Sequence, residues 1–187
     1  MLGRKGRRNA EEATSPSGDV SPARSRANDG KSRKRKSSDT QGPPRPWRVL
    51  IAGDDADSVE LLARLLDAAG HEIVIADTRM EVLGLVVAGG ISCVVLDMTR
   101  SGTGDANNVL VALRSALDQG AANVPIVLCG SRGVNEIFAW DTGADEVIRR
   151  PFRPETLEDA IESAVVRPSA ERPEYRRYRR AAAMDGA

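Results

Sequence analysis

Residues 48–76 read RVLIAGDDADSVELLARLLDAAGHEIVIA, and this stretch decides the fold. Two apolar runs of strand length, VLIA at 49–52 and IVIA at 73–76, flank a segment whose leucines have helical spacing. Gly70 follows that segment as a helix stop. The order strand, helix, strand is typical of the repeating unit of a parallel sheet.

The same alternation continues to about residue 166. Further apolar runs, rich in β-branched residues, occur at 93–96 (CVVL), 125–129 (PIVLC) and 146–148 (EVI). Segments with helical spacing follow each run, and the last begins at Pro154, which suits a first helical turn. Five alternations predict an α/β fold, a doubly wound parallel five-stranded sheet with helices on both faces. In the first helix the pattern predicts an apolar stripe formed by Leu61, Leu62, Leu65, Leu66 and Ala69.

Charge divides the chain into three parts. Residues 1–46 hold 12 Lys and Arg against 5 acids, residues 167–187 hold 6 against 3, and the part between them is acidic. Both ends lack the large apolar residues needed to offset the entropy of ordering. We therefore expect a disordered basic tail at 1–46, one domain at 47–166 and a disordered basic C-terminal tail at 167–187.

The sequence shows neither a secretory signal nor a transmembrane segment, so we expect a cytoplasmic protein. Cys93 and Cys129 lie inside apolar runs without CxxC spacing, which favours buried free thiols over a metal site or a disulfide. The only histidine, His71, follows the first helix stop, where a solvated loop residue is expected. A single histidine in such a position disfavours triad catalysis.

Polar residues follow the predicted strands at their carboxyl ends. Asp54 and Asp55 come directly after the first strand, Asp97 ends the third, and Gly130 and Ser131 follow the fourth. Ligands of open parallel sheets bind at this edge. The sequence therefore gathers its candidate site there.

Four segments, in this order, resemble the receiver domain of bacterial response regulators. They are DDADSVELLARLLDAAGHEI (54–73), CVVLDM (93–98), VPIVLCGS (124–131) and GADEVIRRPF (143–152). The resemblance covers roughly residues 47–166. It implies a flavodoxin-like (βα)5 fold of the CheY-like family with strand order 2-1-3-4-5.

The resemblance also implies a site for aspartyl phosphorylation. Asp97 would be the phospho-acceptor, and Arg150 would contact the phosphate in place of the usual lysine. Asp54, Asp97 and the backbone carbonyl of Thr99 would hold Mg²⁺, which prefers carboxylate, carbonyl and water oxygens and neutralises charge on the transferring group.

Several positions depart from the family pattern. The first of the usual two acids is Gly53, and the position of the usual hydroxyl is Gly130. Arg150 presents a planar fork where the family has the compact ammonium of lysine. The aromatic switch position reads Val147, and the proline after the acceptor loop reads Ser101. We therefore expect an atypical receiver in which phosphorylation is weakened or lost and Mg²⁺ binding is weak or absent.

The resulting interpretation is a single-domain signalling protein, not an enzyme, that acts in bacterial signal transduction through protein–protein contact. Its expected partner is a histidine kinase or a downstream signalling protein. Phe138 and Trp140, in the fourth helix, are candidates for the partner face, and the family implies a homodimer through the fourth helix and fifth strand. Three alternatives remain open: a functional, Mg²⁺-dependent acceptor at Asp97, an enzyme or small-ligand protein on a flavodoxin-like sheet, and a regulator that binds nucleic acid through its basic tails.

Overall fold

The computed structural model describes residues 45–98, 105–117, 123–131 and 134–185; the side chains of 105–107 and 116–117 lie outside the description. All of these residues belong to one unit, Ser38–Ala187. The strands of this part of the chain are β1 (Arg48–Gly53), β2 (Glu72–Ile75), β3 (Cys93–Met98), β4 (Ile126–Gly130) and β5 (Glu146–Arg149). Its helices are α1 (Ala56–Ala68), α2 (Arg79–Ala88), α3 (Asp105–Leu117), α4 (Glu136–Thr142), α5 (Pro154–Val166) and α6 (Arg172–Asp185).

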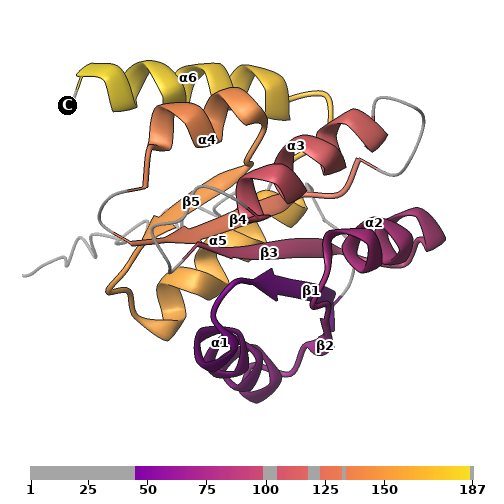
Figure 1. Ribbon diagram of the computed structural model, residues 1–187. Coiled ribbons are helices and arrows are strands. Elements are labelled where there is room, and N and C mark those ends of the chain that lie inside the picture. The colour runs from indigo at the N-terminus through magenta and orange to yellow at the C-terminus, as the bar shows by residue number, and fades with distance from the viewer. Residues whose placement is uncertain (1–44, 99–104, 118–122, 132–133, 186–187) are drawn as a thin grey trace, which may run out of the picture. The chain divides into compact units, whose positions relative to one another are not determined.

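The strands form one parallel sheet with the order β2-β1-β3-β4-β5, which confirms the predicted fold class and strand order. Helices α2, α3 and α4 cover one face of the sheet, and α1 and α5 cover the other (Figure 1). The central strand β3 is buried on both faces because successive side chains alternate between the two cores. Val94 and Leu96 enter the first core, whereas Cys93 and Val95 enter the second.

Helix α1 begins directly after the first strand, with Asp55 as its N-cap. The Asp55 side chain accepts a hydrogen bond of 3.1 Å from the Ser58 backbone N–H, so one of the free donors of the first turn is satisfied. The helix buries Val59, Leu62 and Leu66 and leaves Leu61 45% exposed. The predicted stripe was therefore too wide, because α1 presents only a narrow i, i+3, i+7 face to the sheet.

His71 lies in an aromatic cluster at the amino end of the sheet, so the prediction of a solvated residue was wrong. Its ring stacks on Trp47, with 5.3 Å between ring centroids and 5° between planes. The Trp47 backbone N–H donates to His71 Nδ1 (3.4 Å), and His71 Nε2 lies 3.2 Å from Glu158 of α5. Arg45 also contacts Glu158 and stacks over Trp47. His71 thus connects Trp47, directly before β1, to α5.

The C-terminal region also differs from its prediction. Residues 172–185, expected within a disordered tail, form α6, which lies along α4 on the outside of the sheet (Figure 1). Sequence reasoning missed this helix because its contacts are made by arginines rather than by a broad apolar face. Of the tail expected at 1–46, residues 1–44 lie outside the described residues.

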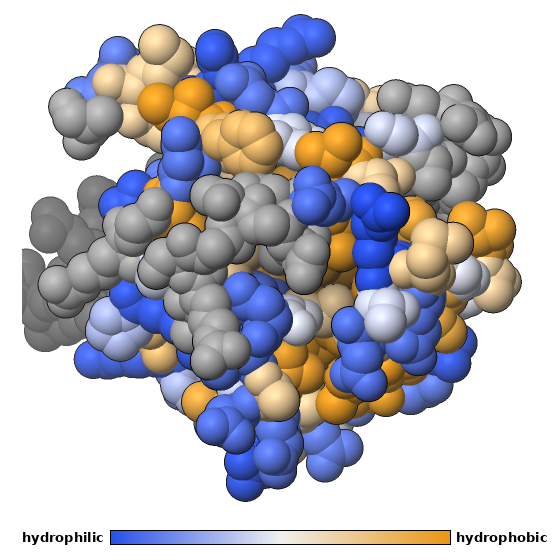
Figure 2. Space-filling model, in the orientation of Figure 1, coloured by the Kyte–Doolittle hydropathy of each residue, from blue (hydrophilic) through white to orange (hydrophobic). Residues whose placement is uncertain are grey.

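On the face that Figure 2 shows, polar residues mix with scattered apolar ones. None of the helices in the described ranges is long and apolar enough to cross a membrane. Singly exposed apolar side chains are ordinary on a protein surface. The large ones here are Leu61, Ile75, Met80, Val87, Val111, Phe138, Tyr178 and Met184.

Both cysteines are free and fully buried, so we predict that neither thiol reacts in the native protein at neutral pH. Burial raises the pKa of Cys93 and of Cys129, and the charge of Asp97 raises that of Cys129 further. Because the thiolate is the nucleophile, labelling by a thiol reagent should follow the global unfolding rate. A Ser115→Cys variant, with its thiol on an exposed helix position, should label at once. Fast labelling of Cys93 or Cys129 without denaturant would contradict the prediction.

Candidate functional site

The parallel sheet brings the ends of β1, β3, β4 and the turn after β5 to one edge. Gly53 pairs with Asp97 across β1 and β3, and Gly130 pairs with Met98 of β3 and with Arg149 of β5. Asp54 and Arg150 directly follow β1 and β5. Four of the residues that sequence reasoning singled out, Asp54, Asp97, Gly130 and Arg150, thus lie at this edge. Thr99 lies outside the described residues.

Asp97 is fully buried and forms an ion pair with Arg150. Arg150 Nη2 donates to Asp97 Oδ1 over 3.0 Å, and the Arg150 side chain is 23% exposed. The guanidinium also lies 5.2 Å from the centroid of the Phe152 ring, so it is packed on one side. A buried carboxylate needs such a partner because an uncompensated charge costs several kcal/mol in the interior. The acceptor position of this chain therefore already has a cationic partner.

Asp54 and Asp55 have different roles. The Asp54 atom Oδ1 is buried and has no hydrogen-bond partner, so it remains able to accept a donor or a cation. Asp55 is bound to the first turn of α1 as its N-cap. This capping role of Asp55, beside the uncommitted Oδ1 of Asp54, supports the alignment in which Asp54 corresponds to the second acid of the family pattern.

Gly53 occupies a position too tight for the missing acid. A Cβ at this position would lie 2.8 Å from the Cβ of Asp97, 3.0 Å from Val59 Cγ2 and 3.1 Å from the Asp97 carbonyl oxygen. Real side chains almost never approach so closely, so an acid here would need β1 and β3 to move. The glycine is matched to its surroundings.

Gly130 occupies a second tight position, where the family has a hydroxyl. A Cβ built there would overlap the side chain of Val134, with 2.8 Å to Val134 Cβ and a still closer approach to Cγ2. Ser131, next in the chain, instead lines a cavity of about 510 Å³ with Arg150 and Phe152. The hydroxyl side chain is therefore absent from the strand end, and a valine fills its space.

The donor set fits a resident Mg²⁺ poorly. Among the residues that the structure describes, no group of three or more His, Cys, Asp or Glu side chains could hold a metal ion. The edge offers one carboxylate oxygen without a partner, on Asp54, and one carboxylate already paired with Arg150. Mg²⁺ demands near-octahedral oxygen ligation, usually with acidic ligands.

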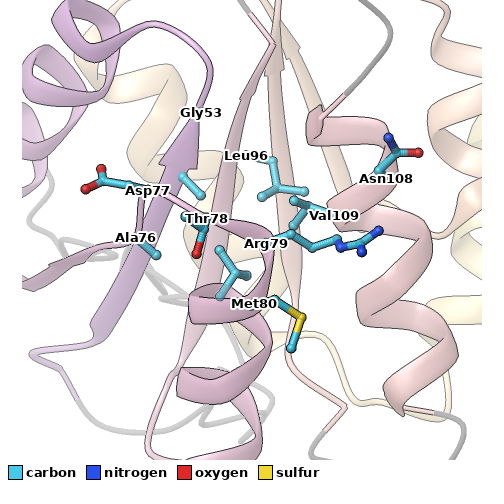
Figure 3. A pocket seen from close by; sticks show the side chains of 11 residues that line it. Gly53, Ala76, Asp77, Thr78, Arg79, Met80, Leu96, Asn108 and Val109 are labelled. Atoms are coloured by element: carbon cyan, nitrogen blue, oxygen red, sulfur yellow. The ribbon is translucent and has the colours of Figure 1, made fainter.

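A larger cavity, of about 610 Å³, lies beside this edge on the other face of the sheet. Figure 3 shows Leu96 and Val109 toward one side of it and Thr78, at the beginning of α2, toward the other, with Arg79 between them. Gly53 and Asn108 also line it. Sequence reasoning missed this cavity because the turn into α2 has no apolar pattern.

The proposed partner face is only partly accessible. Phe138 of α4 is 42% exposed, whereas Trp140 is 2% exposed and lies against α6. The ring of Tyr175 meets that of Trp140 edge to face, with 6.2 Å between centroids. Trp140 thus has a structural role in this state of the molecule, because α6 covers its ring, and its place on a partner face stays a prediction.

Comparison with known proteins places these features in context. No family model matches the chain. Over 111 residues it is 29% identical to the phosphate regulon transcriptional regulatory protein PhoB of Pseudomonas aeruginosa, covering 58% of this chain and 47% of PhoB. The chain spans about half the length of the curated relatives it matches.

Two solved structures illustrate the fold. The response regulator receiver domain protein from Clostridium thermocellum matches with a TM-score of 0.54 and 22% identity, over 64% of this chain and 94% of that one. The co-crystal structure of the Saccharomyces cerevisiae histidine phosphotransfer protein Ypd1 with the receiver domain of Ssk1 matches with a TM-score of 0.55 and 17% identity, over 64% and 88%. The structure neighbours named here are receiver domains of response regulators, whose fold this chain shares, and PhoB is named as a transcriptional regulatory protein.

Proposed function

We propose that this chain is an atypical receiver of a two-component system that works through protein–protein contact, with phosphorylation of Asp97 weakened or lost. The ion pair between Arg150 and Asp97 is the observation that carries the proposal. A phospho-acceptor aspartate must present an oxygen to the incoming phosphoryl group while a metal ion neutralises the charge on that group. Here a guanidinium donates to Oδ1 of the acceptor.

Two further features support the loss. The first acid of the family pattern is Gly53, whose surroundings leave no room for a side chain. The position of the hydroxyl that would hold the phosphate is Gly130, and Val134 fills the space of its side chain. At each glycine, neighbouring side chains occupy the space that the family's side chain would need. Restoring a single residue therefore does not restore the site.

A working acceptor is the second candidate, and the buried, unpartnered Oδ1 of Asp54 favours it. In that case Asp54, Asp97 and the Thr99 carbonyl would hold Mg²⁺, and Arg150 would turn from Asp97 to the phosphate. The metal would supply charge neutralisation during transfer. A carboxylate oxygen of Asp97 would form a bond to the phosphoryl group. The N–P bond of the donor's phosphohistidine would break, which returns that histidine to its unphosphorylated form.

The partner classes follow from the relatives. PhoB is named as a transcriptional regulator, and the Ssk1 receiver was crystallised with a histidine phosphotransfer protein. For this chain we propose a histidine kinase, a phosphotransfer protein or a downstream signalling protein as partner, in the cytoplasm. Homodimerisation through α4 and β5 stays a proposal. Helix α6 lies on α4 and so covers part of the surface that such a dimer would use.

We predict that millimolar Mg²⁺, with or without beryllofluoride, leaves the amide NMR spectrum of the full chain nearly unchanged at Asp54, Asp97 and Gly130. Beryllofluoride mimics an acyl phosphate on aspartate and needs the metal for its binding. The physical reason is the small number of uncommitted carboxylates at this edge.

A pair of arginine variants gives the controls. Arg150→Ala removes the cation paired with Asp97, and Arg153→Ala removes an exposed arginine from the same segment. A Mg²⁺ response in Arg150→Ala but not in Arg153→Ala would identify the ion pair as the block. Large shifts in the wild type that vanish in Asp97→Asn would contradict the proposal and establish the second candidate.

A further inference from the structure

The contacts that hold α6 centre on the fully buried carboxylate of Asp145, the residue directly before β5. Asp145 Oδ2 accepts from Arg114 Nη2 of α3 (2.7 Å) and from the Ile126 backbone N–H (2.9 Å). Its Oδ1 accepts from Arg176 Nη1 of α6 over 2.9 Å. One carboxylate thus joins α3, β4 and α6.

Two acids near Asp145, Glu146 and Asp141, also form ion pairs with arginines of α6. Glu146 pairs with Arg167 (2.7 Å), which precedes α6, and lies 3.7 Å from Arg179 of α6. Asp141, on α4, pairs with Arg180 over 2.5 Å. We call Asp141, Asp145, Glu146 and the ring of Trp140 the acidic face. Three arginines of α6, Arg176, Arg179 and Arg180, meet it.

Aromatic contacts complete the fit between α6 and the acidic face. The guanidinium of Arg179 lies 4.9 Å from the centroid of the Trp140 ring. Tyr175 meets the same ring edge to face and has the Arg167 guanidinium 3.3 Å from its own centroid. Arginine stacks on aromatic rings while its N–H groups donate to carboxylates, so one side chain serves both contacts.

Charge rather than apolar burial holds the helix. Tyr175 and Ala183 are the α6 residues that pack as partly buried hydrophobic groups on the core, and the face turned outward carries Arg177 and Tyr178. A helix of this length is marginal in water by itself, so its order depends on the contacts with the domain. Attraction between exposed charges, such as Arg180 and Asp141, weakens as salt rises.

The domain keeps its own partners for the acids when α6 is absent. Asp145 retains Arg114 and the Ile126 N–H, and Glu146 retains Arg167 and Ser163, none of which belongs to α6. Departure of α6 therefore leaves neither buried carboxylate without a donor. A releasable helix requires this of the acids that it covers.

We propose that the acidic face is a binding surface for an arginine-rich amphipathic helix, and that α6 is its resident and releasable occupant. A partner protein that carries an arginine-rich amphipathic helix of the same pattern binds the acidic face by displacing α6. The proposal does not depend on phosphorylation of Asp97, because no residue of the acidic face belongs to the edge that holds Asp97.

Amide hydrogen exchange of the full chain tests release with a matched pair of variants. Arg176→Glu removes a donor to Asp145, whereas Arg177→Glu makes the same charge change at the next, exposed residue. Loss of one charge-assisted hydrogen bond should speed exchange of residues 172–185 about tenfold in Arg176→Glu relative to Arg177→Glu. Exchange in β3 should stay unchanged in both variants. In the wild type, added NaCl should speed exchange in α6 alone.

Two results would overturn release. Equal exchange of α6 in the two variants would mean that the pairing with Asp145 does not hold the helix. Faster exchange of β3 together with α6, in Arg176→Glu or in salt, would mean that α6 is an integral part of the fold.

A labelled peptide of residues 168–187 tests the binding surface itself. Fluorescence anisotropy should show the peptide binding to full-length Arg176→Glu more tightly than to Arg177→Glu, whose acidic face stays occupied. Adding Asp141→Arg to Arg176→Glu should weaken that binding, because it places a positive charge opposite Arg180 of the peptide. The proposal would be overturned if the peptide bound neither variant, or if Asp141→Arg left its affinity unchanged.

Discussion

Replacing Asp145 with alanine is expected to lower the free energy of unfolding by about 3 kcal/mol or more, because it removes the partner of a buried cation. The Arg114 side chain is 16% exposed, and burial lowers its pKa while Asp145 opposes that change. The substitution also leaves the Ile126 N–H without its acceptor inside the sheet. Urea denaturation followed by far-ultraviolet circular dichroism measures the loss.

Asp141→Ala is the matched control for this prediction. Asp141 is half exposed and has one ion pair, with Arg180, so its loss should cost less than about 1 kcal/mol. If the two alanine variants were equally stable, the buried network around Asp145 would contribute no more than a surface ion pair, which would contradict the prediction.

Restoring a hydroxyl residue at the end of β4 should also destabilise the protein. Gly130→Thr is expected to cost about 1–3 kcal/mol, because its Cβ would overlap Val134 in a packed position. The backbone there is held by pairing with β3 and β5 and by the hydrogen bond from the Arg150 N–H to the Gly130 carbonyl, 2.8 Å long. The strain must therefore be taken up by the loop that carries Val134.

A double-mutant cycle with Val134→Gly identifies the cause. Removing the valine side chain should reduce the cost of Gly130→Thr by about 1 kcal/mol or more, since residues in contact are coupled. Gly84→Thr, at a helix position whose added Cβ would meet nothing within 4 Å, is the control and should show no such coupling. Purely additive costs would rule out the overlap as the reason.

The sheet was predictable from sequence because its signal is local. The runs around Leu50, Val95 and Val127 are apolar on both faces, as strands covered by helices on both sides must be, and the structure places β1, β3 and β4 there. The strand order came from the resemblance, not from the runs themselves. Which residues meet at the carboxyl edge then followed from the topology.

What sequence reasoning missed depends on residues distant in the chain. Arg176 reads as part of a solvated basic tail until Asp145, 31 positions earlier, appears beside it. His71 reads as a loop residue until Trp47 stacks on its ring. The space that Val134 takes beside Gly130 is likewise a tertiary fact. The periodicity of apolar residues cannot indicate such pairs, because it reflects only residues that are close together in the sequence.

The two tryptophans give the protein a pair of built-in optical reporters. Both rings are shielded from water, yet Trp47 stacks on an imidazole at the amino end of the sheet and Trp140 lies under the guanidinium of Arg179. Replacing either ring with phenylalanine leaves a single tryptophan, whose emission can be excited selectively. The emission of Trp47 then follows the entry of the chain into β1, and that of Trp140 follows the seating of α6, without any added dye.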